Sequence, residues 1–344
     1  MTLLTDPFSL ILSIRLNELN MLYSYLDAVK QSLVDALNQD DQVFLMGEDI
    51  ASYGGAFKVT EGLLDQFGQN RIIDTPIAEG GIIGTAIGAA LAGMKPIVEM
   101  QFMDFISCGF NQITNFAAKC HYRWGAQVPL VIRGPGGGLV GGGPFHSQAM
   151  EMYFVKTAGL KVVMPSTTQD AYSLLQSAIA DPNPVIFIEH KALYRAPHLK
   201  ADIDLAMKIP LGKAVYRRTG QDLVIITYSA MVHRALEASQ ILQEQGINCA
   251  VLDLRTLNPL DDEAIISAVK KYHKVLILHE DTMMAGIAGE IAMRIQANAF
   301  EWLDAPIMRL TSADTPVPYH PDLEAVFAPS VEKIVESCRS LHRY

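Results

Sequence analysis

The fold of this chain depends on one stretch, Asp74-Thr75-Pro76-Ile77-Ala78-Glu79-Gly80-Gly81, in which an extended segment ends and a small-residue helix begins. The proline disfavours helical geometry in the residue before it, so we expect the helix to begin at about Glu79. Gly80, Gly84 and Gly88 are spaced four apart and therefore share one face of that helix. Because each glycine costs about 1 kcal/mol relative to alanine within a helix, this pattern indicates close approach by another segment.

Glu79 has two interpretations at this point. A carboxylate in the first turn of a helix commonly interacts with the helix dipole and does nothing more. A charged group that leads into a tightly packed helix also indicates a functional position. The residues around Glu79 leave both interpretations open.

The composition predicts a folded protein with two domains. The chain has 344 residues, of which 50% are hydrophobic and 19% charged, enough for sizeable cores. A net charge of −10 argues against binding to nucleic acid or to an anionic membrane. No run approaches the ~20 apolar residues of a membrane span. Residues 1–20 lack the features of a secretory signal, so we interpret them as an N-terminal extension and expect a cytoplasmic protein.

Strand-like and helix-like segments alternate along the whole chain, which predicts an α/β protein with two doubly wound parallel-sheet domains. A stretch with proline, lysine and aspartate predicts a linker at 199–212, between domains at 21–198 and 213–344. In the first domain we expect strands at 42–46, 71–74, 96–100, 128–133, 160–165 and 185–189, and helices at 23–37, 109–122 and 168–180. In the second domain we expect strands at 223–227, 247–252, 274–278 and 307–310, and helices at 231–245, 262–272, 286–300 and 330–341.

Glu48 follows directly after the apolar run at 42–46. In α/β proteins the carboxyl end of a buried parallel strand is where ligands bind, so Glu48 is a candidate site residue. A solvated loop is the alternative explanation.

The segment 134–148 has the most unusual composition of the chain, with seven glycines before His146. Gly136, Gly138 and Gly141 match the dinucleotide pattern G-x-G-x-x-G after a strand. However, no helix begins at the third glycine, and no acidic residue for a ribose follows at the usual distance, so we reject that match. The glycines are better explained by a backbone that approaches a ligand and brings His146 into a cleft, although a lone histidine is often structural.

Several segments together resemble the β subunit of the thiamine-diphosphate-dependent 2-oxo acid dehydrogenases, the E1 component. Each segment alone is a weak signal, but their combination in this order is specific and extends from Met21 over nearly the whole chain. The segments are 43–49, 53–60, 74–79, 146–148, 159–163, 252–256 and 314–318. The resemblance implies a pyrimidine-binding domain followed by a transketolase-like C-terminal domain.

The resemblance also implies roles for individual residues. It matches Glu79 to the glutamate that hydrogen-bonds N1′ of the cofactor's aminopyrimidine, where burial would raise its pKa and suit it to a shared proton. Glu48, Gln101 and Phe105 match other pocket positions, with Phe105 against the pyrimidine face. His146 matches the active-site histidine that serves substrate binding or acylation of the lipoyl group.

A potassium site is implied as well, built mainly from backbone carbonyls. Oxygen ligands suit a hard cation. Without the resemblance, the segment 181–184 predicts only a turn. The matching residues are Leu130, Ala178, Ile179, Asp181 and Asn183.

The family holds Mg²⁺ and the cofactor's diphosphate on a Gly-Asp-Gly motif, and none occurs in this sequence. We therefore expect a separate E1 α subunit to hold Mg²⁺ in an α2β2 heterotetramer, and the E2 acyltransferase to supply the lipoyl group. The segments 143–146 and 279–281 favour a branched-chain 2-oxo acid over pyruvate by resemblance. The alternatives are an acetoin dehydrogenase β subunit, a β-like partner without catalysis, and a nicotinamide oxidoreductase.

Overall fold

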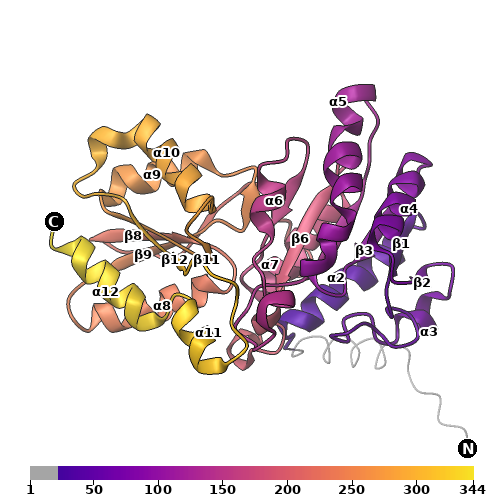
Figure 1. Cartoon of the computed structure of the whole chain (residues 1–344), viewed down its shortest axis with the longest axis horizontal. Helices are drawn as coiled ribbons and strands as arrows, with labels where there is room; N and C mark the ends of the chain where they lie inside the picture. The colour runs from indigo at the N-terminus through magenta and orange to yellow at the C-terminus, as the bar shows by residue number, and fades with distance from the viewer. Residues whose placement is uncertain (1–21) are drawn as a thin grey trace, which may run out of the picture.

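The computed structural model describes residues 22–344, and its strands form two sheets that lie side by side along the long axis of the molecule (Figure 1). Both sheets are mostly parallel and have helices on both faces. The predicted fold class is therefore confirmed. The predicted extension at 1–20 lies outside the described residues.

The N-terminal half, residues 22–198, contributes six strands of a seven-stranded sheet with the order β10-β5-β6-β4-β3-β1-β2. The strands are β1 (Val43–Gly47), β2 (Ile72–Asp74), β3 (Lys95–Glu99), β4 (Val131–Gly136), β5 (Lys161–Val163), β6 (Val185–His190) and β10 (Thr256–Asn258). The α-helices of this half are α2 (Tyr25–Gln39), α3 (Leu63–Phe67), α4 (Glu79–Leu91), α5 (Cys120–Trp124), α6 (Glu151–Val155) and α7 (Thr168–Ile179).

Helices cover both faces of this sheet because its central strands are apolar on both sides. In β1, Val43 and Leu45 pack in the same core as α2 and α7, whereas Phe44 and Met46 pack in the same core as α4. All five residues of β1 are buried. This near-continuous apolar run is typical of a parallel strand between two helical layers.

The C-terminal half, residues 213–344, forms a five-stranded sheet with the order β12-β11-β8-β9-β7. The strands are β7 (Val215–Arg218), β8 (Leu223–Thr227), β9 (Cys249–Asp253), β11 (Val275–Thr282) and β12 (Met308–Ser312). The α-helices are α8 (Met231–Gln243), α9 (Asp262–Tyr272), α10 (Ile287–Ala299), α11 (Pro321–Phe327) and α12 (Val331–His342). Figure 1 shows α9 and α10 on one side of this sheet, and α8 and α12 on the other.

Two edge strands are antiparallel, and the sequence did not predict them. β7 pairs with β9 at the edge of the second sheet. β10 lies in the C-terminal half of the sequence but pairs with β5 of the first sheet. The two halves are therefore joined by strand pairing as well as by side-chain packing.

The helix predicted at 109–122 is present, but it is irregular. The helical stretch passes from the 3-10 helix η1 (Met103–Gly109) through the π-helix η2 (Gln112–Phe116) and the 3-10 turn η3 (Ala117–Lys119) into α5. Side chains compete for the backbone carbonyls here, since Thr114 Oγ1 donates to the Phe110 carbonyl at 2.8 Å and Cys120 Sγ to the Phe116 carbonyl at 3.3 Å. Such back-bonding weakens regular helical pairing.

The segment predicted as a linker packs against the N-terminal half rather than extending freely. Thr168 Oγ1 donates to the Leu199 carbonyl at 2.5 Å, and Ser177 Oγ to the Ile209 carbonyl at 2.6 Å. Leu199, Ile203 and Ile209 are buried. The domain bounds themselves stay a prediction.

Within residues 22–344 no helix has the length and apolar character needed to cross a membrane.

Candidate active site

Three of the predicted site residues lie at one edge of the first sheet. Glu48 follows β1, Glu79 is the first residue of α4 after β2, and Gln101 follows β3. Because β1 pairs in parallel with both β2 and β3, the carboxyl ends of these strands meet at the same edge. This is the edge at which open α/β sheets bind ligands.

Glu48 has the unusual electrostatics of a functional residue. Its side chain is buried, and its Oε1 has no hydrogen-bond partner among the described residues. Burial raises the pKa of Glu48, and the negative charges of Glu79 and Asp49 raise it further. A carboxyl with a raised pKa and an unpaired oxygen is a candidate for sharing a proton with a ligand.

Glu79 is only half-buried, which differs from the burial expected for it. It begins α4 behind Ala78, which provides no side-chain cap for the helix. The neighbouring Asp74 has a supporting role, since its carboxylate accepts from the backbone N–H of Ala51 at 2.6 Å and thereby restrains the loop that follows Glu48.

Three aromatic rings form a partly buried cluster. The imidazole of His146 lies edge-on to Phe102 and Phe105, with ring centroids 4.8 and 5.4 Å apart. The two phenyl rings are 6.0 Å from each other. The structure therefore brings the predicted residues Phe105 and His146 together, and it adds Phe102, which no sequence signal had singled out.

The glycine-rich segment forms a loop that closes on itself. The Gly137 N–H donates to the Gln148 carbonyl at 3.2 Å and joins the two ends of the loop at 137–148. Asp104 restrains the second end, because its Oδ1 accepts from the backbone N–H of Gln148 at 2.9 Å and from the side-chain amide at 3.1 Å. His146 therefore lies two residues before Gln148, whose position these hydrogen bonds restrain.

Lys191 is a candidate site residue that the sequence interpretation missed. It follows β6, and its buried Nζ has no hydrogen-bond partner among the described residues. Burial lowers the pKa of Lys191 to about 8, against the opposing effect of the charges on Asp104, Glu280 and Glu324. The rule that selected Glu48, a charged residue after a buried strand, would also have found Lys191.

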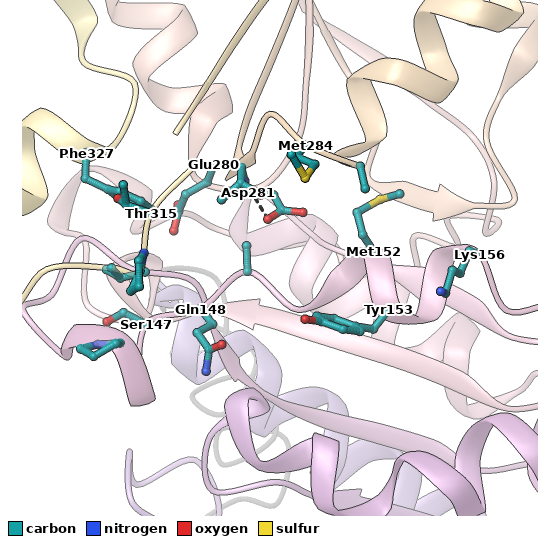
Figure 2. Close-up of a pocket in the computed structure, with 16 residues that line it drawn as sticks. Ser147, Gln148, Met152, Tyr153, Lys156, Glu280, Asp281, Met284, Thr315 and Phe327 are labelled. Atoms are coloured by element: carbon teal, nitrogen blue, oxygen red, sulfur yellow. Dashed lines mark hydrogen bonds between the residues drawn. The ribbon is translucent and has the colours of Figure 1, made fainter. Parts of the chain in front are cut away.

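A cavity of about 580 Å³ lies between the two halves, next to the residues that follow His146 (Figure 2). Ser147, Gln148 and Tyr153 line it from the N-terminal half, and Asp281 and Met284 from the C-terminal half. Burial raises the pKa of Asp281 to about 6. This acid therefore titrates near neutral pH at the boundary between the halves.

The residues predicted to bind potassium come together where α7 ends beside β4 and β6. Their oxygens already accept hydrogen bonds: the Leu130 carbonyl from the Val185 N–H at 2.9 Å, and Asp181 Oδ1 from Lys161 Nζ at 2.8 Å and the Asn183 N–H at 2.9 Å. The oxygen-rich turn fits a hard cation, but the Lys161 ammonium already balances the one negative charge.

Comparison with known proteins identifies the family. The family description "Transketolase, pyrimidine binding domain" matches residues 23–197, and "Transketolase, C-terminal domain" matches residues 212–334. The 2-oxoisovalerate dehydrogenase subunit beta of Bacillus subtilis is 45% identical over 326 residues, which are 93% of this chain and 99% of the relative. The pyruvate dehydrogenase E1 component subunit beta of Rickettsia felis is 41% identical over 320 residues, 92% of this chain and 98% of the relative. The chain belongs to the E1 β subunits of the 2-oxo acid dehydrogenases.

This membership confirms the resemblance that the sequence motifs had indicated. E1 β subunits are components of oxidoreductases that depend on thiamine diphosphate, and they pair with an E1 α subunit. A solved structure, "Split gene transketolase, inactive beta4 tetramer", superposes with a TM-score of 0.77 at 17% identity, covering 93% of this chain and 98% of the other. At that identity the likeness supports the shared fold alone.

Proposed function

We propose that this E1 β chain supplies the pyrimidine half of a thiamine diphosphate site that is completed by an E1 α subunit. The observation that carries the proposal is the meeting of Glu48 and Glu79 at one sheet edge, close enough for the charge on Glu79 to raise the pKa of Glu48. The assembly would decarboxylate a 2-oxo acid oxidatively and transfer the acyl group to the lipoyl group of E2.

The residues present fit the aminopyrimidine of the cofactor. Glu48 has an unpaired buried oxygen, Glu79 is at the mouth of the site, and the ring of Phe105 offers an aromatic face. When bound, the cofactor would supply the electron sink for cleavage of the bond to the carboxylate. Glu79 would share a proton with the ring nitrogen N1′, and Glu48 and Gln101 would accept and donate hydrogen bonds around the same ring.

His146 would act on the substrate side of this site. Its ring packs edge-on against Phe102 and Phe105, which restrains the orientation of the imidazole. An imidazole can donate or accept a proton at a ring nitrogen. We assign His146 to binding the 2-oxo acid or to proton transfer during lipoyl acylation.

The exposed face of α4 supports contact with E1 α in an α2β2 heterotetramer. Gly84 and Gly88 are exposed, and a methyl group at position 88 would meet no atom within 4 Å. Leu91, one turn further, is 45% exposed. The first glycine of the row differs, since Gly80 packs against the chain's own Gln112. The proposed E1 α subunit would hold Mg²⁺ and the diphosphate.

The test is the substitution Glu79→Gln in the chain purified together with its E1 α subunit. We expect the complex to assemble normally and to lose at least about 100-fold in decarboxylation measured with an artificial electron acceptor, the usual effect of removing an acid–base group. Glu61→Gln, at an exposed glutamate of the same half, is the control and should retain full activity. Undiminished turnover of Glu79→Gln would refute the role at N1′.

The substrate is tested on the same complex. We propose a branched-chain 2-oxo acid, and expect a higher kcat/KM for 2-oxoisovalerate than for pyruvate. A preference for pyruvate would reverse this assignment, and cleavage of acetoin instead would support the acetoin dehydrogenase alternative. Inactivity of a well-assembled complex toward all short 2-oxo acids would leave the non-catalytic partner as the better explanation.

Potassium binding at the turn of Asp181 is a separate proposal. We expect a higher thermal unfolding midpoint in K⁺ than in choline at equal ionic strength, because bound cation stabilises the folded form by mass action. Asp181→Ala should abolish that difference. Equal midpoints for the wild-type chain in both salts would contradict the site, and the Lys161 ammonium would then be the cation of this turn.

A further inference from the structure

The glycine-rich loop is held by carboxylates from the other half of the chain. The Gly138 N–H donates to Glu280 Oε1 at 2.5 Å. The Leu139 N–H donates to Glu324 Oε1 at 2.8 Å, and the Gly141 N–H to Glu324 Oε2 at 3.0 Å. Three backbone donors of the loop are therefore bound by two side chains that lie 142 to 185 residues later in the sequence.

Glu324 is buried, unlike its neighbours on the same helix. It is 6% exposed, whereas Leu323 and Val326 on the same short helix α11 are 59% and 68% exposed. Burying a carboxylate is costly unless it is hydrogen-bonded, and both of its oxygens accept from the loop. The contact thus accounts for the burial of Glu324.

Glu280 is also held by a histidine of the N-terminal half. Because a carboxylate can only accept, His190 Nε2 donates to Glu280 Oε2 at 2.7 Å, and the Ala192 N–H lies 3.2 Å from His190 Nδ1 and helps to hold the ring. Burial would raise the pKa of Glu280, but His190, the Gly138 N–H and the charge of Lys191 together outweigh it and lower the pKa to about 2. Glu280 is therefore ionised throughout the physiological range.

The loop is shaped to reach these carboxylates. Leu139 has a φ of +67°, which is costly for a residue with a side chain and requires the surrounding structure to maintain it. Gly143 has a φ of +66°, and a Cβ there would lie 2.4 Å from the ring of Tyr319 in the C-terminal half. The loop is thus packed against the C-terminal half on both sides of the Glu324 contact, immediately before His146.

We propose that Glu280 and Glu324 are positioning residues, through which the C-terminal half restrains the loop at 137–148 and holds His146 against Phe102 and Phe105. The proposal rests on the proposed role of His146 in the active site. Neither carboxylate touches the reacting atoms in this scheme. Their hold on His146 passes through the backbone of the loop.

The restraint itself is tested by hydrogen exchange in the assembled complex with E1 α. Glu324→Gln keeps the size of the side chain but leaves one acceptor oxygen for two N–H donors. We expect amide exchange in peptides covering 137–148 to accelerate about tenfold, because a buried charged acceptor is lost, with α12 unaffected. Asp322→Asn, on the same helix with a side chain that is 92% exposed, should leave exchange unchanged. Unchanged loop exchange in Glu324→Gln would overturn the restraint.

The effect on His146 is tested by a double-mutant cycle. We expect Glu324→Gln to lower kcat for lipoyl-domain acylation about tenfold in the wild-type background and not at all in the His146→Ala background. A purely structural role would lower activity by the same factor in both backgrounds, and that result would overturn the positioning role. A loosened loop with undiminished kcat would overturn it too. An inactive wild-type complex would instead refute the proposed function, and the exchange measurement would still decide the restraint.

Discussion

Arg133→Met should destabilise the chain strongly and in a pH-dependent way. The guanidinium of Arg133 donates to both carboxylate oxygens of Glu189, at 2.6 and 2.5 Å, and also contacts the carboxylate of Glu99. The three side chains are 1%, 0% and 7% exposed. They lie on β4, β6 and β3, so this cluster joins three central strands at the edge where the site residues gather.

The magnitude follows from what the substitution leaves behind. Without Arg133, two buried carboxyls would have no cation, and removing one partner of a buried ion pair costs about 3–5 kcal/mol. Burial already raises the pKa of Glu99, and loss of the guanidinium would raise it further. A carboxyl whose folded pKa is raised loses stability as pH rises above its unfolded pKa of about 4.3. The loss in free energy of unfolding caused by Arg133→Met should therefore be large at pH 8 and small at pH 4.

Urea unfolding of the chain, followed by circular dichroism at both pH values, measures this loss in free energy of unfolding. With a slope of about 2–3 kcal/mol per M, a loss of about 3–5 kcal/mol lowers the midpoint by about 1–2.5 M at pH 8. Lys95→Met is the control, because its ion pair with Asp40 is partly exposed and should be worth less than about 1 kcal/mol. Adding Glu99→Gln and Glu189→Gln to Arg133→Met should restore most of the loss. Equal midpoints for the Arg133 and Lys95 variants at pH 8 would refute the reasoning.

Three further predictions concern single residues. Because the pKa of Glu48 is raised, Glu48→Gln should increase the urea midpoint at pH 8 and leave it unchanged at pH 4, and no gain at pH 8 would contradict the burial argument. Gly137→Ala would place a Cβ 2.3 Å from the His190 ring and should destabilise the chain by more than about 1 kcal/mol. Gly93→Ala is the control, because Gly93 also has a positive φ but a Cβ there would meet no atom within 4 Å. If both variants lose the same free energy of unfolding, the clash with His190 contributes nothing. Burial lowers the pKa of His279 to about 4, so the folded chain should lose stability as pH falls from 6.5 toward 4, and His279→Gln should flatten the thermal midpoint between pH 7.5 and 5.

The elements that could be predicted from the sequence are those with local signals. The strand at 223–227 and the helix at 262–272 have the predicted bounds, because a buried apolar run marks the first and the N-cap Asp261, which accepts from the Ala264 N–H, marks the second. β10 has no such signal. It is three residues long, and it exists because β5, far away in the sequence, offers it an edge. Pairing of that kind is decided by tertiary contact and not by local preference.

The site divides in the same way. The rule that ligands bind at strand ends selects Glu48 from the sequence, whereas the family resemblance selected Glu79 and Gln101. The pairing of β1 with β2 and β3, which places the three at one edge, is known only from the structure. Lys191 obeys the same rule and could have been found. Glu324 could not, because it is on a short helix at the far end of the chain and becomes relevant only when the two halves pack. Its residue type and spacing contain no information about the loop that it binds.

The packing of the halves also explains why the glycine-rich loop is not a dinucleotide site, although it matches G-x-G-x-x-G. A pyrophosphate would need free backbone N–H groups and a positive local field. Here the N–H groups of Gly138, Leu139 and Gly141 are already donated to Glu280 and Glu324, and two carboxylates would repel a phosphate. The backbone N–H groups that would bind an anionic ligand in a dinucleotide site therefore bind the protein's own Glu280 and Glu324 here.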